Sequence, residues 1–218
     1  MKKYSKLHSA QLSGLTTQII TVEADISNGL YSFAVVGLAD KAVSEARDRI
    51  SSAIKNSGFE SPKQKNHKLV ISLSPANQKK EGSRFDLAMA VAYLIASGKV
   101  IFDTSKRLFI GELSLDGSVL PVSGILPVIY SMSALGFEEI FLPAGCLSTI
   151  DSPQEIRIYP VASLKELFDH MSGKQCISPL TCTDKVRLDT YSQQILEFDM
   201  ADIVGHELEK RALTVAAI

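Results

Sequence analysis

Apolar residues recur with two different periods along this chain, and the alternation between them limits the folds that it can adopt. Segments 4–13, 17–26 and 30–36 are rich in β-branched and aromatic residues and are predicted strands. Segments 41–57 and 83–98 instead carry apolar residues at helical spacing, and each is followed or closed by a glycine. Strands that alternate with helices predict a mixed α/β domain in which helices pack on a sheet.

The same alternation continues toward the end of the chain. Asn28-Gly29 and Asp116-Gly117 are typical of tight turns, so each is predicted to close a β-hairpin. Ser83 is expected to cap the helix that starts there, with Asp86 as its reciprocal partner, and Ser163 with Glu166 indicates a second capping box. Further strands are predicted at 68–74, 107–114, 118–120, 139–143 and 156–161, and further helices at 125–135 and 163–171.

The composition is that of a water-soluble protein with one core. The 218 residues are 45% hydrophobic, which suffices for one domain of ~150 residues and a tail. The formal net charge of −1, from 23 basic and 24 acidic side chains, gives no overall attraction to nucleic acid or membranes, so such binding must be local. Lys2 and Lys3 do not begin a signal peptide, and no apolar run approaches the ~20 residues of a membrane span. We expect a cytoplasmic protein.

Cysteines and histidines indicate neither a disulfide framework nor a metal centre. The cysteines are odd in number and form no C-x-x-C pair, and the histidines have no cysteine or carboxylate at ligand spacing. We expect reduced thiols and no bound metal. The residues concerned are Cys146, Cys176, Cys182, His8, His67, His170 and His206.

Two segments resemble the catalytic part of the Lon-type serine-lysine peptidases. KKEGSRFDLAMAVAYLIASG (79–98) is similar to the turn and helix that carry the nucleophilic serine, and GELSLDGSVLPVSGILP (111–127) is similar to the segment that supplies the lysine. The serine position holds Arg84 and the lysine position holds Leu126. A guanidinium is not a nucleophile, and an isobutyl group cannot accept a proton. The resemblance therefore implies a peptidase scaffold without its catalytic pair.

A narrower resemblance covers roughly residues 5–170. GLADKAVSEARDRISSAI (37–54), SLSPA (72–76) and KEGSRFDL (80–87) are similar to signature runs in the N-terminal domain of the Mg-chelatase-like AAA+ ATPases, the ComM/YifB group. This resemblance implies an α/β (α+β) fold of the Lon-protease-domain-like and GHMP-kinase-like superfold, with a mixed sheet and a left-handed βαβ crossover. The sequence pattern alone favours the commoner right-handed crossover.

The end of the chain resembles the lead-in helix of an AAA+ module. We expect three parts: a Lon-like N-terminal (Mg-chelatase subunit ChlI-like) domain at 1–172, a linker at 173–197 and the lead-in helix at 198–218 of a longer protein. The resemblance implies ATP and Mg²⁺ as cofactors of that longer protein and a hexamer of neighbouring subunits as its assembly. No phosphate-binding G-x-x-x-x-G-K-[ST] loop occurs in this chain, so we expect no cofactor here.

Three features are candidates for contacts, and each has an alternative interpretation. Gly82-Ser83-Arg84 could hold an anion at a helix start, or form a plain turn and cap. The 44–49 segment could face a neighbouring subunit or DNA, or be an exposed helix face in which Glu45 pairs with Arg49. A basic rim could contact the phosphate backbone of DNA, or be a solvated loop. The residues of these candidate contacts are Arg47, Asp48, Arg49, Lys63, Lys65, Lys68, Lys79, Lys80 and Arg84.

The resemblance implies a non-catalytic accessory or assembly domain. The longer protein is then expected to be an ATP-dependent DNA-remodelling motor, of the kind that drives branch migration during competence and recombination. Two alternatives remain open. One is a Lon-like peptidase with Ser83 or Ser123 as a non-standard nucleophile, and the other is a protein-interaction module without DNA. We expect no contact with membranes.

Overall fold

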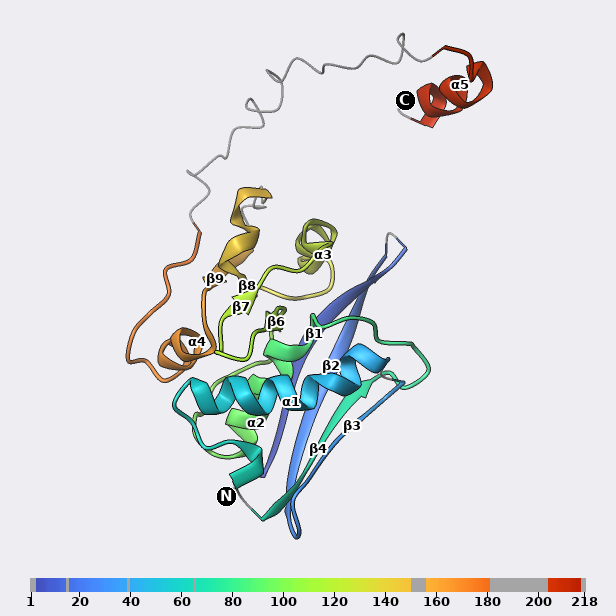
Figure 1. Cartoon of the computed structure of the whole chain (residues 1–218). Helices are drawn as coiled ribbons and strands as arrows, with labels where there is room; N and C mark the ends of the chain where they lie inside the picture. Colours follow the sequence, from blue (N-terminus) through green and yellow to red (C-terminus); the bar gives the residue numbers. More distant parts are fainter. Residues whose placement is uncertain are drawn as a thin grey trace. The chain divides into compact units, whose positions relative to one another are not determined.

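The computed structural model describes residues 3–14, 16–38, 40–64, 66–149, 156–180 and 204–216. The chain divides into two compact units, residues 1–185 and 186–218. The first unit holds every described strand and four helices, and the second holds one helix. Figure 1 shows these elements along the chain.

A seven-stranded mixed sheet organises the first unit, with the strand order β3-β4-β2-β1-β5-β8-β9. Strand β2 pairs antiparallel with both β1 and β4, and the other neighbours pair in parallel, so β2 alone runs against the rest of this sheet. The strands are β1 (Tyr4–Ser13), β2 (Thr16–Asn28), β3 (Ser32–Val36), β4 (His67–Ser74), β5 (Arg107–Phe109), β8 (Glu139–Pro143) and β9 (Arg157–Val161). The predicted mixed α/β class is confirmed.

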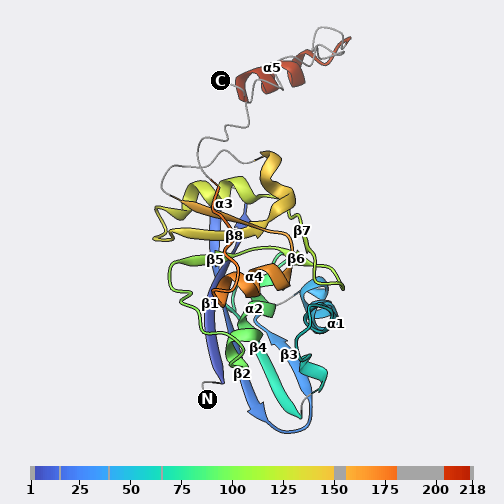
Figure 2. The same ribbon diagram turned by 90° about the vertical axis from the view of Figure 1, so that its left-hand side faces the viewer.

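Helices cover the two faces of the sheet unequally, as Figure 2 shows. Helices α1 (Lys41–Asn56), α2 (Asp86–Ala96) and α4 (Leu164–Met171) share one large apolar core with the sheet. Helix α3 (Ile125–Met132) forms a second core on strands β1, β5, β8 and β9. The period-2 alternation explains this division, because Phe141 on β8 lies in the first core and its neighbours Ile140 and Leu142 lie in the second.

The predicted hairpin at Asn28-Gly29 is wrong. Strands β2 and β3 are not neighbours, because β4 lies between them and pairs with both. A crossover through α1 brings β4 back to this place, and its buried Leu69, Ile71 and Leu73 fill the centre of the sheet face under α1 and α2. The second predicted hairpin is confirmed: β6 (Glu112–Leu113) pairs with β7 (Val119–Leu120), and Gly117 has a positive φ of 92° in the turn.

The predicted strand 107–114 is interrupted, and the two predicted capping boxes have different outcomes. The strand breaks at Gly111, whose N–H donates to the Arg84 carbonyl and whose own carbonyl accepts from Leu87 N. Helix α2 begins at Asp86 without a side-chain cap, so the predicted cap by Ser83 is wrong. At α4 the predicted cap by Ser163 is confirmed, because Glu166 N donates to Ser163 Oγ at 3.2 Å, whereas Glu166 Oε2 accepts from Ala162 N, one residue before the N-cap.

Residues 173–180, the first part of the predicted linker 173–197, lie within the described residues. Ile177 is buried in the first core, and Leu180 N donates to the Ile158 carbonyl, so the described residues 173–180 pack on the domain. Residues 181–197 of the linker lie outside the described residues. Two 3-10 turns, Pro62–Gln64 and Ala144–Thr149, complete the first unit.

The second unit contains α5 (Glu207–Ala216) from the predicted helix 198–218, and residues 198–203 and 217–218 lie outside the described residues. Its apolar Leu208 and Leu213 are exposed. In the part of the chain that the structure describes, no helix has the length and apolar character needed to cross a membrane.

Candidate functional site

The loop between β4 and α2 is fixed by a buried lysine. The side chain of Lys80 is fully buried, and its ammonium donates to the carbonyls of Pro75 and Gln78. Its backbone bonds both to Leu38 and to Asp40, which joins this loop to the segment before α1. Burial lowers the pKa of Lys80. Lys80 therefore holds the loop together. Because it is buried, it cannot belong to the predicted basic rim.

Asp40 holds the other side of the same loop, and the sequence analysis did not single it out. Its carboxylate caps α1 by accepting from Val43 N at 2.8 Å and also accepts from Gly82 N at 3.1 Å. The signal was present, because an aspartate directly before a helical stripe is a typical N-cap. The loop 75–84 is therefore anchored at two points before it reaches Ser83 and Arg84.

Arg84, which holds the serine position of the peptidase resemblance, reaches across to the segment that precedes α3. Its Nη2 donates to the Ser123 carbonyl at 2.7 Å, whereas Nη1 is buried without a hydrogen-bond partner. No carboxylate forms an ion pair with Arg84 among the described residues. Burial lowers the pKa of Arg84. Leu126, at the lysine position, is partly buried and packs against the second core.

Ser83 is bonded to a carboxylate rather than to a lysine or histidine. Its hydroxyl donates to Glu112 on β6, the hydrogen bond that replaces the predicted helix cap. Glu112 is a further residue of this region that sequence reasoning missed.

Two polar cavities lie on either side of Arg84. One, of about 530 Å³, is bounded by the ends of β1 and β2 and by the loop 78–84; its lining includes Gln11, Ser13, Gln18, Gln78, Lys79 and Arg84. The other, of about 390 Å³, lies between residues 81–84, Glu112 and residues 121–123. Ser83 and Ser123 both line the second cavity. Arg84 therefore contributes charge to both.

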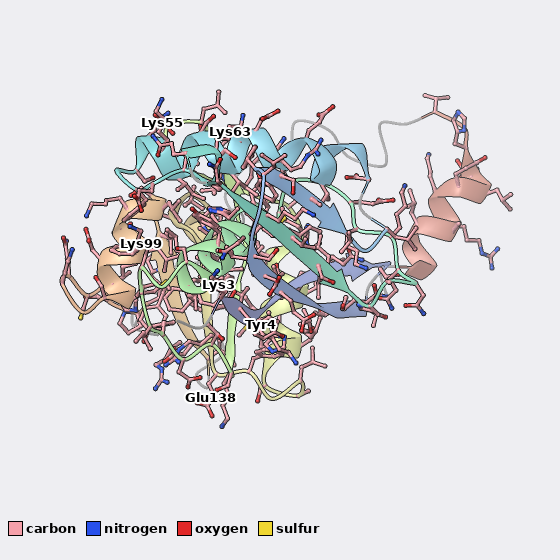
Figure 3. All side chains as sticks on the ribbon, turned by 90° about the horizontal axis from the view of Figure 1, so that it is seen from below. Lys3, Tyr4, Lys55, Lys63, Lys99 and Glu138 are labelled. Atoms are coloured by element: carbon pink, nitrogen blue, oxygen red, sulfur yellow. The ribbon has the colours of Figure 1, made fainter. Side chains whose placement is uncertain are left out.

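The candidate contact residues on α1 are turned in different directions. Arg49 points into the domain and pairs with buried Asp86, with 2.9 Å between Nε and Oδ2. Asp48 is exposed and pairs with Lys63 at 2.7 Å, and Figure 3 shows Lys63 beside α1. Arg47 donates to the Phe33 carbonyl at 3.4 Å. The alternative of an exposed helix face does not hold for Arg49, whose side chain is 24% exposed.

The described lysines that remain from the candidate rim have different surroundings. Lys79 pairs with Glu81 at 2.8 Å, and both side chains are about two-thirds exposed, at 67% and 66%. Lys68 is exposed on β4, and Lys65 lies outside the described residues. Lys79 and Arg84 are the two candidate cations that line one cavity. Among the described residues, no cluster of three or more histidine, cysteine or acidic side chains could hold a metal ion.

Several known proteins are similar in sequence to most of this chain. The family model for subunit ChlI of Mg-chelatase matches residues 22–145. Competence protein ComM of Haemophilus influenzae is 30% identical over 97% of this chain and 41% of its own length. Protein YifB of Escherichia coli is 32% identical over 98% of this chain and 40% of its own length. Protein Rv2897c of Mycobacterium tuberculosis is 35% identical over 96% of this chain and 40% of its own length.

The chain thus spans about 40% of the length of these relatives. The family model covers more than half of the chain, including the loop 75–84, Arg84 and Leu126. This agrees with the resemblance drawn from the runs at 37–54 and 80–87. The chain belongs to the family of the ChlI subunit of Mg-chelatase, which it shares with ComM and YifB.

Proposed function

We propose that this chain is the non-catalytic N-terminal accessory and assembly domain of a longer Mg-chelatase-like AAA+ ATPase. The longer protein uses ATP and Mg²⁺, assembles into a hexamer and remodels DNA. The relative ComM carries the name of a competence protein, which is the support for a role with DNA. The domain has the Lon-protease-domain-like and GHMP-kinase-like superfold with its left-handed crossover.

One observation carries the non-catalytic part of the proposal. Arg84 occupies the nucleophile position and is tied to the Ser123 carbonyl, while Leu126 packs against the second core. Peptide hydrolysis by a serine needs a base that takes its proton. Neither Arg84 nor Leu126 supplies such chemistry, and the Ser83 hydroxyl is bonded to Glu112 rather than to a lysine of the kind that the peptidase pair uses.

The ion pairs on the surface favour assembly over a DNA grip by this domain alone. Lys80 is buried and Lys63 is paired with Asp48, so Lys79 and Arg84 are the candidate cations that remain together at one cavity. Few cations are left to displace counterions from a phosphate backbone, and that displacement drives non-specific DNA binding. We therefore assign DNA contact mainly to the assembled ring, in which several copies act together.

Deletion in the longer protein tests the assembly role. Mass photometry with ATP and Mg²⁺ would compare the full-length protein with a form lacking residues 1–172. We expect the deletion to lower the hexamer fraction while each remaining subunit still binds ATP. Equal hexamer fractions at every protein concentration would refute the assembly role.

A peptidase assay separates the proposal from the Lon-like alternative. We expect no cleavage of unfolded casein or of fluorogenic peptides by the chain. Arg84→Ser is expected to stay inactive, because the new serine would still lack a base. Cleavage that persists through purification and disappears in Ser83→Ala or in Ser123→Ala, the two candidate nucleophiles in the same cavity, would establish the alternative.

A further inference from the structure

We propose that the cavity between the β1–β2 ends and the loop 78–84 is a binding site for a phosphate group, with Arg84 and Lys79 as its cationic ligands. The proposal goes beyond the accessory role, because it assigns a ligand chemistry to one cavity. It does not depend on that role being correct. The cavity has about 530 Å³, room for a phosphate together with the group that carries it.

The charge of Arg84 is the first reason. Arginine keeps its charge in proteins, and a partly desolvated guanidinium without a counter-ion is unfavourable. Here one carbonyl, that of Ser123, accepts from Nη2, and no carboxylate forms an ion pair with the guanidinium among the described residues. Glu81 lines the same cavity but pairs with Lys79 instead of Arg84. An anion in the cavity would supply the missing negative charge next to the guanidinium.

The walls of the cavity are built in advance. Gln11 on β1 is 8% exposed, and its Nε2 donates to the Lys79 carbonyl at 3.0 Å and lies 3.3 Å from Gln18 Oε1 on β2. These bonds join the two strands to the loop that carries Lys79 and Arg84. Lys80 and Asp40 fix the same loop from the other side. A ligand would therefore meet a site that needs little ordering.

Lys79 can change its ion-pair partner when a ligand binds. Its ion pair with Glu81 is between two largely exposed side chains, and such pairs contribute little to stability. The ammonium can exchange Glu81 for a ligand oxygen at small cost. The cavity wall then carries one net positive charge even when Glu81 is counted.

The number of donors favours phosphate over a carboxylate. A carboxylate has two oxygens, which one arginine can satisfy by itself. Phosphate has additional oxygens in other directions, and this cavity presents Lys79 and the polar side chains of Ser13 and Gln78 besides Arg84. Either a small free phosphate compound or the phosphodiester of a nucleic acid would supply this group.

Titration with inorganic phosphate, followed by two-dimensional NMR of the ¹⁵N-labelled chain at constant ionic strength, tests the site. We expect saturable shifts of the amides of residues 78–84 and of Gln11. Arg84→Gln should weaken the affinity by about tenfold or more, the loss typical of a charge-assisted hydrogen bond. Lys79→Gln should weaken it less, by about two- to fivefold. Lys68→Gln is the control, because this exposed lysine on β4 does not line the cavity.

The outcomes are distinct. Absence of saturable shifts at these amides overturns the proposal. It is also overturned if the single variants Lys79→Gln and Arg84→Gln both bind phosphate as tightly as the wild type does. Acetate that binds as tightly as phosphate also overturns it, in favour of a carboxylate site. Lys79 is exposed, so Lys79→Gln remains informative if Arg84→Gln does not fold.

A second arm identifies the source of the phosphate. An oligo-dT strand that shifts the same amides and is displaced by inorganic phosphate indicates the nucleic-acid backbone. Inorganic phosphate that binds while oligo-dT causes no shift at residues 78–84 indicates a small phosphate compound. Both results support the site, and neither depends on the hexamer measurement that tests the assembly role.

Discussion

Arg49 on α1 and Asp86 at the start of α2 form a two-point ion pair inside the domain. Arg49 Nε lies 2.9 Å from Asp86 Oδ2, and Nη2 lies 3.3 Å from Oδ1. The carboxylate is fully buried, and it also accepts from Leu113 N at 3.4 Å. One side chain of α2 thus joins α1, α2 and the β6–β7 hairpin.

Removal of Arg49 should be strongly destabilising. Arg49→Met leaves the Asp86 carboxylate buried without its cation, and the expected loss is about 3 kcal/mol in the free energy of unfolding at pH 7. Urea denaturation measures it. Arg49→Met with Asp86→Leu should recover much of the loss, because no unpaired charge remains. Lys63→Met, which breaks an exposed pair, is the control and should change stability by less than about 1 kcal/mol. Equal effects of the two single changes would contradict the buried pair.

The stability of the domain should depend on the protonation of Asp86. Burial raises the pKa of Asp86 from 3.8 to about 6, and the hydrogen bond and charge of Arg49 lower it only in part. Between these two values the folded protein binds more protons than the unfolded chain. The contribution of Asp86 to the free energy of unfolding therefore falls as pH rises from about 4 to 6, by about 2–3 kcal/mol.

Asp86→Asn isolates this effect, because it removes the titrating group and leaves the other carboxylates. Urea denaturation of both proteins at several pH values gives the difference in their free energies of unfolding. We expect the wild type to lose stability relative to Asp86→Asn across this range. A constant difference would show that Asp86 titrates at its ordinary pKa, and a change in the opposite direction would show that the fold lowers this pKa; either result contradicts the prediction.

Two adjacent lysines should respond very differently to the same substitution. Lys80→Met leaves the Pro75 and Gln78 carbonyls without their buried donor, and we expect a loss of about 2–3 kcal/mol in the free energy of unfolding. Lys79→Met removes only an exposed pair and should change it by less than about 0.5 kcal/mol. Chemical denaturation compares them, and similar values for both would mean that the Lys80 ammonium is solvated.

The chain should not bind ATP by itself. Tight binding of nucleotide phosphates in AAA+ proteins needs a glycine-rich loop with its lysine, and this sequence has none. Isothermal titration calorimetry with ATP and Mg²⁺ should show no saturable one-to-one binding in the micromolar range. A millimolar affinity that Arg84→Gln weakens by about tenfold or more would instead belong to the phosphate site. Micromolar binding unaffected by Arg84→Gln would place an unrecognised nucleotide site in this chain.

The secondary structure of the first unit was largely predictable, and its strand order was not. Periodicity is local, so it identified β4 at 68–74 against an observed His67–Ser74. Nothing local says that β4 lies between β2 and β3, because strand partners are chosen by the whole sheet. A turn signal at Asn28-Gly29 therefore predicted a hairpin that the topology excludes.

In the candidate site, too, the sequence predicted the positions of residues but not their partners. Resemblance placed Arg84 and Leu126 at the former catalytic positions, but their partners came from the fold. Ser83 was predicted to pair with Asp86 three residues later. In the structure Asp86 instead accepts hydrogen bonds from Arg49, and the Ser83 hydroxyl donates to Glu112. Lys80 was assigned to a solvated rim because lysine is usually exposed. Its burial depends on two carbonyls that face the same point, which no sequence pattern records.

Strand β1 is paired along its whole length with one neighbour in the seven-stranded sheet and at a single position with the other. Strand β1 pairs with β2 from Tyr4↔Asp25 to Ser13↔Thr16, but its parallel pairing with β5 consists of the single register pair His8↔Leu108. Amide hydrogens near this seam should exchange with deuterium sooner than those inside the β1–β2 ladder, because fewer neighbouring bonds must open together. A force that pulls the outer edges of the sheet apart would separate β5, β8 and β9 from the remaining strands at this line. The seam is where mechanical strain on this sheet would concentrate.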